Sequence, residues 1–152
     1  MALALTLKPN ERVIINGCAL VNANRRQTIY IESMADVVRG SDLLDEKAAA
    51  TPATRVYFMI QTALTQVKHR ETLVPLIQKD LAQLACVFGG ASLSSIFKSA
   101  NFISSGDFYK AMAALRPVIK HERELFERIE ARKAAEAGHA ETPSASHGVA
   151  AE

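Results

Sequence analysis

The chain has 152 residues, of which 49% are hydrophobic and 22% charged, and a net charge of only +2 at pH 7. These proportions are typical of a soluble globular protein and exclude a largely disordered chain, and no apolar run approaches the roughly 20 residues that span a bilayer. A charge this small does not by itself require a nucleic-acid partner. The N-terminus has no basic segment ahead of its apolar residues, so we predict no signal peptide and a cytoplasmic protein.

The first forty residues have the two-residue period of β-strands. Leu3, Leu5 and Leu7 alternate with smaller or polar residues until Pro9 ends that run. Asn16-Gly17 is the strongest short signal for a hairpin turn. Further short runs read "RVIING", "CALV", "TIYIES" and "DVVRG". We therefore predict five short strands in a small antiparallel sheet or open barrel.

From about residue 45 the apolar spacing becomes that of helices. Thr51-Pro52 places a capping residue before a proline and predicts the start of a first helix. Thr72 is the expected cap of the second helix and Ser92 the expected start of the third, and Gly106-Asp107 is the expected cap of a long fourth helix.

The predicted fold class is thus α+β, with a small N-terminal antiparallel sheet and a bundle of about four helices. We expect three parts: an N-terminal β module over 1–44, a C-terminal helical region over 45–137 and a disordered tail over 138–152, which has no apolar period.

No pattern in the sequence points to catalysis. The glycine-rich phosphate loops, the nucleophile-elbow motif and the His-Glu-x-x-His zinc motif are all missing. Cys18 and Cys86 are far apart, with no histidine at ligand spacing, and are interpreted as small buried hydrophobic residues. We predict that the protein is not an enzyme, with no catalytic residue, no metal site and no cofactor.

Binding is the remaining class of function. Lys8 and Arg39 follow or end strands, and "NANRRQT" places Arg25 and Arg26 in a turn, where turn chemistry does not require them. The pair is either solvated surface or directed at an anion. Together these four cations form a candidate RNA-binding site at one edge of the sheet. Tyr30 could stack a base, but we interpret it as a half-buried strand residue.

The fourth helix offers a second candidate surface. An apolar stripe runs along it, and beyond Pro117 the helix is highly charged with a narrow stripe, so it either is a solvated terminal helix or binds a partner. The candidate partner-binding residues are Phe108, Met112, Leu125, Phe126 and Ile129.

Several of these segments occur together in one known family. The succession "LTLKPNERVIINGCALVNANRRQTIYIES", "ATPATRVYF" and "SSGDFYKAMAALRPVIKHE" resembles the FlbT family of flagellar biosynthesis regulators over about residues 3–125. The resemblance implies post-transcriptional control of flagellin synthesis through the 5′ untranslated region of flagellin mRNA, by altered translation or stability. It does not fix the transcript, whether synthesis is repressed or promoted, or whether the contact with RNA is direct. The alternative is an adaptor that binds another flagellar regulator or flagellin through its helical half.

A second resemblance concerns the strands alone. Their order and spacing, with a glutamate before the second strand and an arginine in "VVRG", are similar to the CsrA family of small RNA-binding dimers. That family joins its first and last strands from two chains, which implies a homodimer here. Its RNA-binding strand ends match Lys8 and Arg39, although Lys8 is followed by Pro9 where the family has a pair of arginines.

Overall fold

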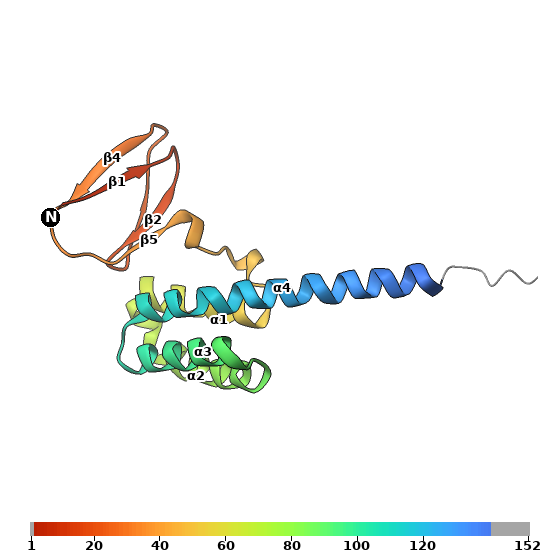
Figure 1. The fold of residues 1–152 in the computed structure, drawn as a ribbon. Helices are drawn as coiled ribbons and strands as arrows, with labels where there is room; N and C mark the ends of the chain where they lie inside the picture. The colour runs from red at the N-terminus through yellow and green to blue at the C-terminus, as the bar shows by residue number, and fades with distance from the viewer. Residues whose placement is uncertain (1, 141–152) are drawn as a thin grey trace, which may run out of the picture. The chain divides into compact units, whose positions relative to one another are not determined.

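Five strands followed by four α-helices make up the computed structural model, which describes residues 2–140 (Figure 1). All the strand pairs are antiparallel. This confirms the predicted α+β class. The strands are β1 Leu3–Leu7, β2 Arg12–Ile15, β3 Cys18–Val21, β4 Gln27–Ile31 and β5 Val37–Arg39.

The turn between β2 and β3 is the predicted one. Asn16 and Gly17 have φ angles of 50° and 80°, as a two-residue turn with two left-handed residues requires. Pairing continues outward from this turn, with Ile15 opposite Cys18 and Arg12 opposite Val21.

Gly17 cannot be replaced without strain. A Cβ atom built on it would lie 2.9 Å from the carbonyl oxygen of Leu64, and its φ is positive. We expect Gly17→Ala to lower the free energy of unfolding by about 1–3 kcal/mol, measured by urea denaturation. Gly89→Ala is the matched control, because Gly89 has open space around its Cβ position and an ordinary φ. An equal loss in both variants would contradict the argument.

The strands form two small sheets that share one core. One sheet pairs β1 with β4, and the other has the order β3-β2-β5. The buried side chains of Leu5, Leu7 and Val13 form the centre, and they contact hydrophobic residues of β4 and β5, among others. The core therefore lies between the two sheets.

β3 contributes nothing to this core, since all four of its residues are exposed. The prediction that both cysteines are buried was wrong. Cys18 begins this exposed edge strand, and Cys86 lies on the outer side of the last turn of the second helix. The prediction relied on the general tendency of free cysteine to be buried, which neither position follows.

The four helices are α1 Pro52–Thr65, α2 Arg70–Val87, α3 Gly90–Ser104 and α4 Phe108–Ala140, and single 3₁₀ turns lie at Gly40–Asp42, Glu46–Ala48 and Val67–His69. Thr51 caps α1 in a reciprocal capping box with Thr54. The Asp107 carboxylate accepts a hydrogen bond from the Lys110 backbone N–H at 3.0 Å and caps α4, as predicted. α2 begins three residues earlier than a cap at Thr72 implies, because the 3₁₀ turn before Arg70 leads directly into it and His69 is its cap. α3 begins two residues before Ser92, with Gly89 as its cap.

The helical core is built from α1, α2, α3 and the first turns of α4. Ser99 is fully buried there and donates a hydrogen bond to the carbonyl of Ala111 at 3.0 Å, which joins α3 to α4. The largest fully buried side chains of this core are Ile60, Ile77, Leu81, Ile96, Met112 and Leu115.

Residues after β5 attach the strands to α1. The side-chain amide of Gln61 donates to the carbonyl of Leu44 at 3.0 Å and accepts from its N–H at 2.9 Å. The Tyr57 hydroxyl donates to the carbonyl of Asp42, and the Asp42 carboxylate lies 3.6 Å from the Arg116 guanidinium. Burial raises the pKa of Tyr57, so this hydroxyl stays protonated as a donor.

The chain divides into two compact units, one ending at Ile119 and one beginning at Lys120. Strands and the first three helices lie in the first unit, so the expected domain boundary near residue 44 stays a proposal. Of the expected tail over 138–152, residues 138–140 belong to α4 and 141–152 lie outside the described residues.

Candidate nucleic-acid interface

Strand register brings the cations of the β-strand region to one end. In the first sheet, Leu7 at the end of β1 lies opposite Gln27 at the start of β4. The second sheet has Arg12 at the start of β2, and Arg39 at the end of β5 pairs with the next β2 residue. Short turns over 8–11 and 22–26 join these ends. We call Lys8, Arg12, Arg25, Arg26 and Arg39 together the cationic end.

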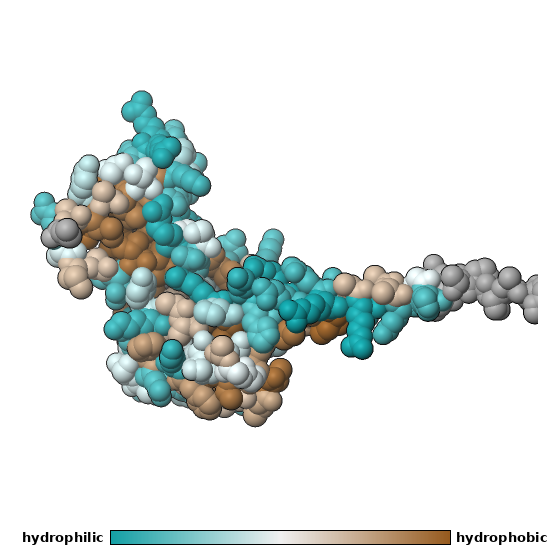
Figure 2. Space-filling model, viewed as in Figure 1, coloured by the Kyte–Doolittle hydropathy of each residue, from teal (hydrophilic) through white to brown (hydrophobic). Residues whose placement is uncertain are grey.

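The opposite end of the strands is acidic. Glu32 follows β4, and Asp36 precedes β5 and is held to the Asn16-Gly17 turn by two hydrogen bonds with Asn16. Residues 2–31, by contrast, hold one acidic residue, Glu11, besides four of the five cations. Figure 2 shows hydrophilic side chains covering the cationic end and projecting from it. Positive side chains therefore gather at one end of the strands and negative side chains at the other.

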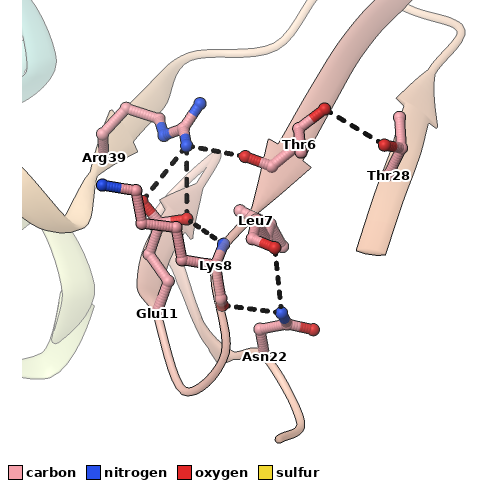
Figure 3. A network of polar contacts seen from close by, with 7 residues as sticks. All are labelled: Thr6, Leu7, Lys8, Glu11, Asn22, Thr28 and Arg39. Atoms are coloured by element: carbon pink, nitrogen blue, oxygen red, sulfur yellow. Dashed lines mark hydrogen bonds and ion pairs between the residues drawn. The ribbon is translucent and has the colours of Figure 1, made fainter. Parts of the chain in front are cut away.

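Asn22 fixes the two cation-bearing turns to each other. Its buried side-chain amide donates to the carbonyl of Lys8 at 2.7 Å and more weakly to that of Leu7 at 3.3 Å (Figure 3). The same amide donates to the carbonyl of Arg25 at 2.8 Å. Two backbone bonds, Asn22 N–H to the Glu11 carbonyl and Asn10 N–H to the Ala23 carbonyl, add to this link. Lys8 and Arg25 are thus neighbours, and Arg26 is next in the chain.

Arg39 lies at the same end but has partners within the chain. One of its terminal nitrogens donates to the carbonyl of Thr6 at 2.8 Å and to both Glu11 carboxylate oxygens at 3.1 and 3.2 Å (Figure 3). Glu11 also accepts from the backbone N–H of Lys8 at 3.0 Å. Arg39 therefore holds the end of β5 against the first turn, and Glu11 partly neutralises its charge. Its expected role in binding RNA stays a prediction.

The pKa of Glu11 is lowered, above all by the hydrogen bond from the Lys8 backbone N–H. Burial opposes this effect, and the hydrogen bond and charge of Arg39 and the charge of Lys8 add to the lowering. A lowered pKa in the folded state means that the contact stabilises the fold above the ordinary value of 4.5, and that this stabilisation is lost as the pH falls below it.

We expect Glu11→Gln to lower the free energy of unfolding at pH 7 by about 1–2 kcal/mol, because a charged hydrogen-bond acceptor is lost. The difference between variant and wild type should shrink as the pH falls below 4.5 and then through the lowered pKa of the folded carboxyl, because the wild-type carboxyl becomes protonated too. Denaturant titrations at a series of pH values measure it. A difference that stays constant with pH would show that the charge of Glu11 does not matter.

Arg12 is a cation that the sequence interpretation left out. Its guanidinium lies 3.8 Å from Asp45, and both side chains are largely exposed, so this pair contributes little stability and leaves the charge in solvent. A signal for Arg12 existed in the sequence. Pairing residues outward from the Asn16-Gly17 turn places Arg12 opposite Val21. Because Asn22 is the next residue after Val21, Arg12 lies close to the turn that carries Arg25 and Arg26.

Tyr30 is not the half-buried strand residue that we predicted, because 69% of it is exposed. It lies on β4 opposite Ala4, on the side of the sheet that faces away from the core. The small side chain opposite it leaves the tyrosine ring uncovered.

The five expected partner-binding residues divide into two groups. Phe108 and Met112 are buried in the core of the first unit and present no surface to a partner. In the second unit, Leu125 is half-buried, whereas Phe126 and Ile129 are each 47% exposed. A partner surface on α4 therefore reduces to these last residues.

A cavity of about 350 Å³ lies between the acidic end of the strands and the helices. Its wall includes Asp36, Arg70 and Asp107. Arg70 donates to the carbonyls of Ala63 and Leu64 at the end of α1, at 2.6 and 3.1 Å, and Asp107 caps α4. Arg70 and Asp107 thus serve to end and begin helices, whereas Asp36 belongs to the acidic end of the strands.

Within residues 2–140, no three histidine, cysteine or carboxylate side chains are grouped so that they could hold a metal ion. No helix of that part combines the length and the apolar character needed to cross a membrane.

Comparison with known proteins points to one family. The family model described as "Flagellar protein FlbT" matches residues 3–126. A probable flagellum biosynthesis repressor protein FlbT of Rhodopseudomonas palustris (strain TIE-1) is 34% identical over 84% of this chain and 100% of its own length. Its counterpart in Caulobacter sp. (strain K31) is 27% identical over 80% of this chain and 94% of its own length.

The flagellum biosynthesis repressor protein FlbT of Caulobacter vibrioides (strain ATCC 19089 / CIP 103742 / CB 15) is 26% identical over 82% of this chain and 89% of its own length. No solved structure matches the chain. The family match covers the whole cationic end, the capped helix α1 and the start of α4. The chain therefore belongs to the FlbT family of flagellar proteins.

Proposed function

We propose that this protein regulates flagellin synthesis after transcription, by binding the 5′ untranslated region of flagellin mRNA through its cationic end and altering translation or stability of that mRNA. The relatives' names describe repression of flagellum biosynthesis, so repression is the proposed direction. Such a protein works where mRNA is translated, in the cytoplasm.

The convergence of the cations carries this proposal. Lys8, Arg25 and Arg26 are exposed on two turns that Asn22 holds together. Phosphate groups of a flexible single strand can contact several such cations at once, and each contact releases condensed counterions. Arg12 extends the surface, and Arg39 with Glu11 keeps the strand ends in place. RNA is the polyanion that the family relationship suggests.

A cell-free translation assay tests the proposed function. The reporter carries the flagellin leader of the source genome, and the matched reporter carries a leader of equal length from a non-flagellar transcript. We expect added protein to reduce synthesis from the flagellin leader several-fold more than from the other. Equal effects on the two reporters, or none, would contradict the proposal.

The proposed assembly is a homodimer formed by strand exchange. Within the single chain, β1 pairs with β4 and β5 pairs with β2. The same pairs formed between two copies would keep every backbone hydrogen bond, so exchange has a low cost. Two cationic ends on one assembly would also raise the effective concentration for a long leader. Light scattering should give twice the mass of the chain, and a monomer at micromolar concentration would contradict this.

An adaptor that binds flagellin or a flagellar regulatory protein is the second candidate function. The exposed pair Phe126 and Ile129, three residues apart on α4, favours it, and Figure 2 shows hydrophobic atoms along one side of this helix. Pull-down of purified flagellin by wild type and by Phe126→Ser/Ile129→Ser distinguishes the two. If the protein is an adaptor for flagellin, wild type should capture flagellin, the variant should not, and both should bind RNA equally. Failure of wild type to capture flagellin would contradict an adaptor role toward flagellin.

A further inference from the structure

The outward face of the β1–β4 sheet is small and polar except for one aromatic ring. Leu5 pairs with Ile29 on the inner face, and Thr6 pairs with Thr28 on the outer face. The hydroxyls of these two threonines are 3.0 Å apart, and their side chains point toward each other in Figure 3. Tyr30 follows on the same face.

The ring of Tyr30 has no packing role in this sheet. Ala4 is its cross-strand neighbour and Thr28 is its neighbour on the same face of β4, and neither is large enough to cover an aromatic ring. The result is an exposure of 69%, against 2% for Tyr57 in the helical core. A large aromatic side chain left this open on a sheet surface is suited to stacking against a planar ligand.

This face is continuous with the cationic end. Lys8 follows Thr6 by two residues, and Arg26 precedes Thr28 by two residues. Along β4, Tyr30 lies three residues from Gln27, which is about 10 Å at the usual rise of a strand. A short single strand whose phosphates contact the turns can therefore reach the ring with one of its bases.

We propose that Tyr30 is a base-stacking site for single-stranded RNA. An unpaired base lies on the tyrosine ring while neighbouring phosphates contact Lys8, Arg25 and Arg26. Single strands are the substrate class because their bases are free to turn toward an aromatic side chain, whereas those of a duplex are not. This inference rests on the proposed function and adds to it a contact that involves no charge.

The test compares RNA with an anion that has no bases. The probes are a labelled 12-nucleotide oligoadenylate and inorganic polyphosphate of similar length, and the proteins are wild type, Tyr30→Val and Tyr30→Phe. Valine removes the ring but keeps a residue that favours strands. Phenylalanine keeps the ring.

We expect Tyr30→Val to weaken oligoadenylate binding about tenfold or more, with an unchanged salt dependence and unchanged polyphosphate binding. Tyr30→Phe should behave as wild type. Wild-type affinity of Tyr30→Val for oligoadenylate would overturn the stacking site and leave the cationic interface standing. An equal loss for polyphosphate would also overturn it, since the ring would then act through the fold. Failure of wild type to bind oligoadenylate would overturn it together with the RNA-binding mode of the proposed function.

Discussion

Replacing Arg25 and Arg26 together with alanine should weaken binding of flagellin leader RNA about 25-fold at 0.1 M salt. Each phosphate contact on a single strand changes the logarithm of the affinity by about 0.7 per tenfold change in salt, so two lost contacts should reduce the slope by about 1.4. Fluorescence anisotropy titrations at several salt concentrations measure both quantities. The fold should be unaffected, because both side chains are exposed.

The matched control is Arg132→Ala/Lys133→Ala. This pair is also adjacent and exposed, but it lies on α4 in the second unit. If the cationic end binds RNA, the control should keep the wild-type affinity and slope. Equal losses of RNA affinity in the two double variants would show that binding depends only on the total charge of the protein.

Asn22→Ala is the second substitution with a large expected effect. It removes the donor that joins the carbonyls of Lys8 and Arg25 and leaves no equivalent group inside the fold, so the free energy of unfolding should fall by about 1–3 kcal/mol. RNA affinity should also fall several-fold, although no charge is removed, because the two turns no longer hold their cations at a fixed spacing. Urea denaturation and anisotropy measure the two effects under conditions where the variant is folded.

Asn24→Ala separates the role of the buried amide from a general effect on the turn. Asn24 lies in the same turn but is exposed, and its replacement should change neither stability nor affinity appreciably. Wild-type RNA affinity in a folded Asn22→Ala variant would mean that the relative position of the two turns is irrelevant to binding.

The strands, their antiparallel pairing and the tight turn could be predicted because local chemistry determines them. Asn16-Gly17 fixes the turn and, by counting, the register of β2 and β3. Thr51 and Asp107 are caps whose side chains act within three residues. The meeting of Lys8 with Arg25 and Arg26 needs in addition the pairing of β1 with β4, two strands that are not consecutive in the chain.

Contacts between distant segments could not be predicted in this way. That Arg39 pairs with Glu11 depends on β5 lying beside β2, a neighbour relation that no periodicity reveals. The exposure of Tyr30 depends on which residue lies opposite it. Phe108 and Met112 belong to the same apolar stripe as Phe126, and only the packing of the first helices decides which part of that stripe is buried.

Photocrosslinking of 4-thiouridine-labelled flagellin leader RNA to the full-length protein tests the central claim most directly, with the crosslinked peptides mapped by mass spectrometry. If RNA binds at the cationic end, crosslinks should appear in peptides that cover residues 8–30. These crosslinks should be lost in the Arg25→Ala/Arg26→Ala variant. Crosslinks confined to α4, or unchanged in that variant, would contradict the account.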